Sequence, residues 1–181
     1  MKALNKATRI IARIAEIAHI VGACIMAVLL VCCIFAPNMA EEMVVGDPAG
    51  ENAIYGFHFT LTGVDGAVDR ASMIIFAVTV VILFVMMALV FHSVYRIIKT
   101  SEGGTPFRPE NVRLLRRIGF LAIGVPVVGI VMSIVGRLVV GPDFAETSTD
   151  FGGVFTGLLV LWLTQVFTRG AELEQDAEGL I

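Results

Sequence analysis

The chain contains a run of 25 residues without a charged side chain, from Ala71 to Tyr95, which constrains the fold more than any other feature. At about 1.5 Å of rise per residue, a helix of this length crosses a hydrocarbon core of about 30 Å. Three further apolar runs predict helices at about residues 14–35, 118–140 and 151–168, of which the first includes Glu16 and the second Arg137. Because backbone polar groups must be paired inside lipid, each run is expected to be helical.

The composition points the same way, with 57% hydrophobic and only 16% charged residues. The sequence therefore predicts an all-α membrane protein with four transmembrane helices, forming one domain over residues 1–181. The first run has a basic lead, as a signal peptide does. It is longer than the usual apolar segment of about 7–15 residues, and its nearest cleavage-like site, Asn38-Met39-Ala40, is a poor match. We expect a retained helix.

The basic residues predict the orientation of these helices. Of 13 Lys and Arg residues, four precede the first helix, six lie in the loop 96–117, and Arg169 follows the fourth helix. Only Arg70 and Arg137 fall on the other side. The positive-inside rule then places both termini and the loop 96–117 in the cytoplasm, and the loop 36–70 outside.

The outer loop 36–70 has the pattern of a strand. Its aromatic and apolar residues alternate with small or polar ones at positions 55–62, and a weaker apolar run, 43–45, precedes a turn-like segment at 46–50. We expect a small extracytoplasmic β-hairpin between helices 1 and 2, with its aromatic face turned toward protein or headgroups. His58 stands alone without ligand spacing, so we expect no metal site there.

The cytoplasmic loop begins a new helix at Pro109, a residue suited to a first helical turn. Arginines at spacings i, i+3 and i+4 then share one helix face. Together with the preceding arginine they form a candidate face for binding a partner or lipid: Arg108, Arg113, Arg116 and Arg117. Topology anchoring by anionic headgroups is the simpler interpretation, and docking of a cytosolic protein is the sharper one; the two are compatible.

The tail 169–181 carries acids on the side of the membrane that holds these arginines. They form a candidate latch onto the arginine face: Glu172, Glu174, Asp176 and Glu178. Such exposed pairs are weak and salt-sensitive, so the latch would be reversible. The simpler interpretation is a solvated helix end.

Small residues recur at spacings of three and four along the third helix, which predicts its packing face. The stripe consists of Gly119, Ala122, Pro126, Gly129, Ser133 and Gly136. We expect this helix to be central and kinked at Pro126. The second helix has few small residues, so we expect it to have the largest lipid-facing area.

Polar residues fall at similar inner-leaflet depth in three helices: Glu16, His19, His92 and Gln165. Two histidines at matched depth could ligate haem or move protons. Such groups near helix ends are more often interfacial and hydrogen-bonded to neighbours. We therefore expect no cofactor and no metal.

The loop motif Gly104-Thr-Pro-Phe107-x-x-Glu110-Asn-Val-Arg-x-Leu115-Arg-Arg-Ile-Gly119 and the tail motifs Arg169-Gly-Ala-Glu172-Leu and Asp176-x-Glu-Gly-Leu-Ile181 resemble a known pattern. The chain is similar to the bacterial membrane proteins of domain of unknown function family 2975. The resemblance implies a small four-helix protein of the bacterial cytoplasmic membrane with no established activity. It also implies a loose link to helix-turn-helix regulators, and it supplies no catalytic residues.

The function classes can be ranked from these features. An enzyme is not expected, because phosphate loops, zinc-protease motifs, nucleophile elbows and paired intramembrane carboxylates are missing from the sequence. The leading hypothesis is a membrane adaptor or regulatory module that contacts lipids and a cytosolic protein, without direct nucleic-acid contact. The alternatives are an oligomeric channel or small transporter, and then a haem-binding redox protein. A homo-oligomer is compatible with each.

Overall fold

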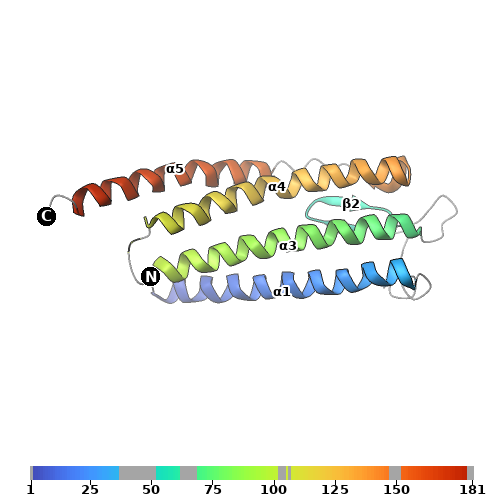
Figure 1. The fold of residues 1–181 in the computed structure, drawn as a ribbon, viewed down its shortest axis with the longest axis horizontal. Coiled ribbons are helices and arrows are strands. Elements are labelled where there is room, and N and C mark those ends of the chain that lie inside the picture. Colours follow the sequence, from blue (N-terminus) through green and yellow to red (C-terminus); the bar gives the residue numbers. More distant parts are fainter. Residues whose placement is uncertain are drawn as a thin grey trace. The chain divides into compact units, whose positions relative to one another are not determined.

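The computed structural model describes residues 2–36, 52–61, 69–101, 105, 107–146 and 152–178. Its elements follow in the order α1 (Lys2–Phe35), β1 (Asn52–Ile54), β2 (Phe57–Phe59), α3 (Arg70–Ser101), α4 (Pro109–Val139), the 3-10 turn η1 (Pro142–Phe144), β3 (Ala145–Glu146) and α5 (Gly152–Glu178), as drawn in Figure 1.

Four helices, α1, α3, α4 and α5, are long and apolar enough to cross a membrane. The protein is thus an all-α membrane protein of four transmembrane helices, as the sequence predicted. The helices continue beyond the apolar runs: α1 begins at Lys2, and α5 reaches Glu178. The new helix does begin at Pro109, as expected, with Glu110 in its first turn.

The contacts within the chain group into two compact units, while the single domain over residues 1–181 stays a prediction. The first unit comprises Met1–His19, Met86–Gly124 and Phe151–Ile181. The second comprises Ile20–Val85 and Val125–Asp150. Three of the four long helices, α1, α3 and α4, contribute segments to both units.

The second unit contains the predicted hairpin. Strands β1 and β2 pair antiparallel, with Ile54 opposite Phe57, so the connection is the two-residue turn Tyr55-Gly56. Both turn residues have positive φ, 48° and 81°, which is the type I′ geometry that suits the twist of a hairpin. The sequence had placed Tyr55 in a strand and a turn at 46–50; Tyr55 belongs to the turn, and residues 37–51 lie outside the described residues.

A third strand extends the hairpin into a sheet. Strand β3 pairs antiparallel with β2, with Phe59 opposite Ala145, giving the order β1-β2-β3. The aromatic face of β2 is buried, with Phe57 and Phe59 at 2% and 1% exposure. The Phe59 ring lies 5.7 Å from that of Phe144 and 5.5 Å from that of Phe76. Because successive strand side chains alternate, one face of this short strand builds the core.

The stripe of small residues on α4 accommodates this core. A Cβ atom at Gly129 would overlap the Phe57 ring, and one at Gly136 would overlap the Phe144 ring. Both glycines and Ser133 are buried. In the second unit, the small-residue face therefore receives aromatic rings from the sheet and η1, where the sequence had suggested contact with another helix.

The two basic residues outside the predicted cytoplasmic clusters each bind backbone carbonyls. Arg70 donates from Nε to the carbonyl of Cys33 at 2.8 Å and from Nη2 to that of Ile34. These carbonyl groups belong to the last turn of α1, so they have no hydrogen-bond donors within the helix and lie at its partially negative end. Arg137 donates to the carbonyl of Ala145 in β3 at 2.9 Å.

One expectation about lipid exposure is wrong. Of the most apolar window of α3, 33% is buried, against 28% for α4 and 11% for each of α1 and α5. The buried face of α3 includes hydroxyl residues, Ser72, Thr79 and Ser93, spaced by multiples of seven. Thr79 and Ser93 donate to their own i−4 carbonyls at 2.7 Å, so these polar groups can be buried without external partners.

A basic pocket as the candidate functional site

In the first unit, a buried carboxylate joins α1 to α3. Glu16, at 6% exposure, accepts hydrogen bonds from Arg13 Nη1 at 2.9 Å and from His92 Nδ1 at 3.0 Å. Arg13 also lies over the Tyr95 ring, 5.3 Å from its centroid. Since an uncompensated charge in an apolar setting is costly, these partners explain how Glu16 can occupy a transmembrane helix.

The other members of the predicted polar layer lie apart from this carboxylate. His19 donates from Nδ1 to the carbonyl of Ala15 at 2.7 Å, and its ring lies 5.1 Å from that of Phe91. Gln165 is exposed on α5. Among the described residues, no group of three or more His, Cys, Asp or Glu side chains is placed to hold a metal ion.

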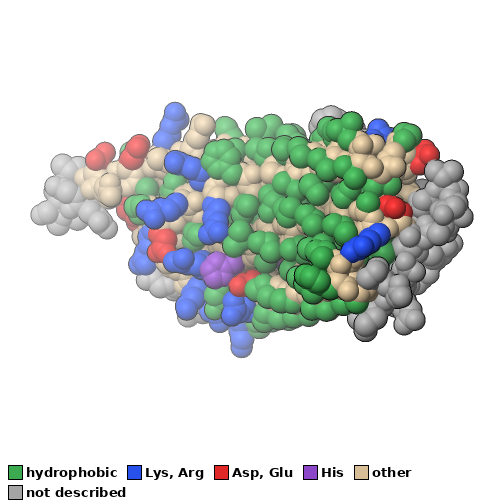
Figure 2. All heavy atoms as spheres, turned by 45° about the vertical axis from the view of Figure 1, so that its right-hand side comes forward, with side chains coloured by type: hydrophobic (Ala, Val, Ile, Leu, Met, Phe, Trp, Pro, Cys, Tyr) green, Lys and Arg blue, Asp and Glu red, His purple; other side chains and the backbone are tan. Residues whose placement is uncertain are grey.

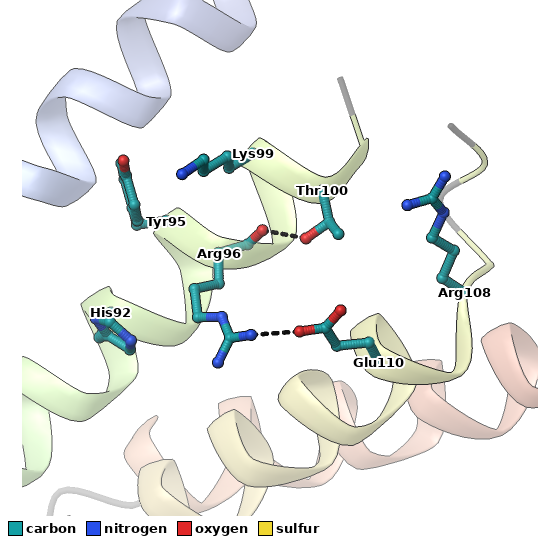
Figure 3. A pocket seen from close by; sticks show the side chains of 7 residues that line it. All are labelled: His92, Tyr95, Arg96, Lys99, Thr100, Arg108 and Glu110. Carbon is teal, nitrogen blue, oxygen red and sulfur yellow. Dashed lines mark hydrogen bonds and ion pairs between the residues drawn. The ribbon is translucent and has the colours of Figure 1, made fainter. Parts of the chain in front are cut away.

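His92 and Tyr95 also form one end of a cavity of about 650 Å³, within the range of small-ligand sites. The lining comes from the end of α3 and from the segment that leads into α4: His92, Tyr95, Arg96, Lys99, Thr100, Arg108 and Glu110 (Figure 3). Positions 92, 95, 96 and 99 follow the i, i+3, i+4, i+7 spacing of one helix face. We call this cavity the basic pocket.

One ion pair in the lining of the basic pocket joins two helices. Arg96 of α3 binds the carboxylate of Glu110 in the first turn of α4, and the Thr100 hydroxyl donates to the Arg96 backbone carbonyl (Figure 3). Glu110 lies at the positive end of the α4 dipole, which favours a carboxylate there. The ion pair thus joins the end of α3 to the start of α4.

The lining of the basic pocket is rich in cations. Arg96, Lys99 and Arg108 contribute positive charge, and Glu110, which pairs with Arg96, is the one carboxylate among the lining residues. In the described part of the chain, the Lys99 ammonium and the Tyr95 hydroxyl have no hydrogen-bond partner. In Figure 3 the Lys99 side chain points away from the Arg96–Glu110 pair. The cavity therefore presents hydrogen-bond donors that could bind an anion.

The structure separates the four predicted face arginines into two groups. Arg108 lines the basic pocket. Arg113, Arg116 and Arg117 are exposed on α4 and lie outside the pocket. Figure 2 shows Lys and Arg side chains gathered beside a broad area of hydrophobic side chains. The predicted binding face thus contains a cavity and a separate exposed arginine face, which we define as residues 113, 116 and 117.

The tail packs on the loop through residues other than these arginines. The Thr105 hydroxyl donates to Glu174 Oε2 at 2.8 Å, and the rings of Phe107 and Phe167 lie 5.3 Å apart. A Cβ at Gly170 would come within 2.6 Å of the Phe107 ring. Within the described residues, no ion pair joins the arginine face to the predicted latch acids; the Glu178 side chain lies outside them.

Helices α4 and α5 approach closely in the first unit. A Cβ at Gly157 would lie 2.8 Å from the carbonyl oxygen of Gly119, and one at Gly119 would lie 2.7 Å from Leu161. Such glycine contacts allow two helix backbones to pack closely in lipid. Gly119, the first residue of the predicted stripe, therefore lies in a contact between α4 and α5.

A family model described as a protein of unknown function (DUF2975) matches residues 46–181. The chain belongs to this family. The resemblance seen in the loop and tail motifs is thereby confirmed. The matched range of DUF2975 contains every residue of the basic pocket but excludes α1. Searches of curated proteins and of solved structures find no significant match.

Sequence reasoning identified the polar depth of Glu16 and His92 but missed the basic pocket. Tyr95, Lys99 and Thr100 had received no role, although their helical spacing from His92 was visible in the sequence. Arg108 had been grouped with Arg113, Arg116 and Arg117, because a loop sequence does not show that only the first of these exposed arginines lines a cavity. The spacing of 92, 95, 96 and 99 was the signal that could have indicated a shared face.

Proposed function

We propose that this DUF2975 protein is a non-enzymatic membrane adaptor or regulatory module of the bacterial cytoplasmic membrane. Both termini and the loop 96–117 would lie in the cytoplasm, as the distribution of basic residues indicates. The arginine face would bind an acidic surface of a cytosolic protein. The resemblance suggests a helix-turn-helix regulator as one such partner.

The observation that carries this proposal is the exposure of the arginine face near the start of α4. Arg113, Arg116 and Arg117 follow the start of α4, which the Arg96–Glu110 pair and the loop–α5 contact hold in place. A preorganised cluster of arginines loses less entropy on binding than a flexible tail does. Arginine also pairs with carboxylates in a bidentate geometry, which favours an acidic partner.

Purification from native membranes tests the proposal. The wild type is compared with Arg113→Gln/Arg116→Gln/Arg117→Gln and with the control Arg169→Gln, an exposed arginine outside the face. We expect one protein to co-purify stoichiometrically with the wild type and the control. Three exposed pairs of about 0.5 kcal/mol each together amount to roughly a tenfold loss in the triple variant.

Topology must be read in the same variants, since the three arginines contribute to orientation. If a correctly oriented triple variant retains the same partner, the arginine face does not bind that partner and serves only to orient the helices. The oligomeric channel or transporter and the haem protein are not proposed, because no specific contact of the described residues favours either.

A further inference from the structure

We propose that the basic pocket binds the phosphate of an anionic phospholipid headgroup. The site is independent of any protein partner, so it extends the proposed function. Its cavity of about 650 Å³ is large enough for a headgroup, and its lining supplies three cations against one carboxylate. Phosphate oxygens are strong acceptors that pair well with arginine, lysine and hydroxyl donors.

The position of the basic pocket along α3 favours a lipid source. The pocket starts at His92 and Tyr95, the last residues of the uncharged run, and continues through Arg96, the first charge after it. A site at this boundary lies at the depth of the headgroups, where aromatic residues such as tyrosine also gather. The acyl chains could then follow the apolar surface of α3 or α1.

The donors are organised in advance. His92 is hydrogen-bonded to Glu16 of α1, and the Tyr95 ring packs against Arg13 of α1. Arg96 is paired with Glu110. Lys99 is exposed and has no ion-pair partner among the described residues, so its ammonium is available to a ligand. Binding the phosphate would neutralise the charge of Lys99 without breaking any of these contacts. The Lys99 ammonium, which has no counter-charge among the described residues, disfavours a headgroup that carries its own cation.

The test uses the full chain, delipidated in detergent and titrated with phosphatidylglycerol, phosphatidylcholine or inorganic phosphate, with binding read by native mass spectrometry. We expect one phosphatidylglycerol per chain, bound with a several-fold preference over phosphatidylcholine. Lys99→Gln removes one charged donor and should weaken this binding roughly tenfold. Lys99→Arg, which keeps the charge, and Arg169→Gln, which removes a charge elsewhere, should bind as the wild type does.

Each other outcome would overturn the assignment. Equal binding of the two lipids, or an unchanged affinity in Lys99→Gln, would exclude the basic pocket as a headgroup site. An equal loss in Arg169→Gln would show unspecific attraction to surface charge. If inorganic phosphate binds at least as tightly and displaces the lipid, the ligand is a soluble phosphate. Because Lys99 and Arg169 are exposed, the variants should fold, and thermal unfolding verifies this. The number of bound lipids is measured separately from any co-purified protein, so the failure of one proposal does not affect the other.

Discussion

At the scale of single residues, the glycines of α4 act through the space that they leave. Phe57 and Phe144 are large rings from the sheet and η1, and they occupy positions that side chains at Gly129 and Gly136 would fill. A protein interior packs at nearly crystalline density, so added atoms there must displace others. The aromatic core of the second unit therefore depends on two residues that contribute no side chain.

Replacing Gly129 by leucine should destabilise the second unit, since the new side chain and the Phe57 ring cannot share the same volume. Overpacking of this kind typically costs about 1–3 kcal/mol. Thermal unfolding in detergent measures the effect, with Val127→Leu as the matched control because Val127 is half exposed on the same helix. Equal melting temperatures of the two variants would show that the ring has room to move.

The spacing of the small residues was visible in the sequence, but their partners were not. Periodicity defines a face of one helix, whereas the residues that fill that face come from Phe57 and Phe144, far apart in the chain. Likewise, no role was predicted from the sequence for the hydroxyl residues Ser72, Thr79 and Ser93. Their hydroxyls donate to acceptors three or four residues earlier in the chain, which lets these residues lie on a packing face. Long-range pairing is what a single sequence does not encode locally.

At the scale of elements, the loop between α3 and α4 is fastened to α5 mainly by packing. The Phe107 ring lies against Gly170 and beside Phe167, and one hydrogen bond joins Thr105 to Glu174. Charge counting had suggested a Coulombic latch because it considers only sign and compartment. Exposed ion pairs are weak, while an aromatic ring packed on glycine gains from area and shape.

Cysteine crosslinking distinguishes these two modes of attachment. In a background where Cys24, Cys32 and Cys33 are replaced by alanine, cysteines at positions 105 and 174 should crosslink readily, because their side chains are hydrogen-bonded in the native protein. The packing contact should make this crosslink insensitive to salt between 0.01 and 0.15 M, about 30 and 8 Å of Debye length.

A pair at positions 113 and 174 serves as the comparison. The tail pairing with the arginine face remains a prediction, and it requires a crosslink at low salt that weakens as salt rises. Salt-sensitive crosslinking at 113–174 that exceeds crosslinking at 105–174 would favour the latch over the packed attachment. Gly170→Val should lower the 105–174 yield, because its side chain would displace Phe107.

At the scale of the whole molecule, four membrane-spanning helices were predictable because hydropathy and length are local properties. The ends of the helices were harder to predict, since charged segments such as 2–13 and 169–178 continue the helices beyond the apolar runs. The grouping of contacts into two units could not be derived, because it depends on which helix faces meet.

Reporter fusions test the orientation that the basic residues predict for these four helices. Fusions after Thr100 and after Ile181 should report the cytoplasm, and a fusion near Gly50 should report the outside, because eleven of 13 basic residues then lie within. An outside result at Ile181 would require an odd number of crossings. That result would contradict the four-helix topology.

The contact of Arg70 with the end of α1 bears on how the chain enters the membrane. In the orientation that we propose, Arg70 lies on the translocated side, where a cation opposes insertion, and in the folded protein it binds the carbonyls of Cys33 and Ile34. The last turn of α1 thereby supplies the counter-charge for the residue that starts the next crossing. We expect the translocation machinery to handle these two helices as one unit, before α4 is synthesised.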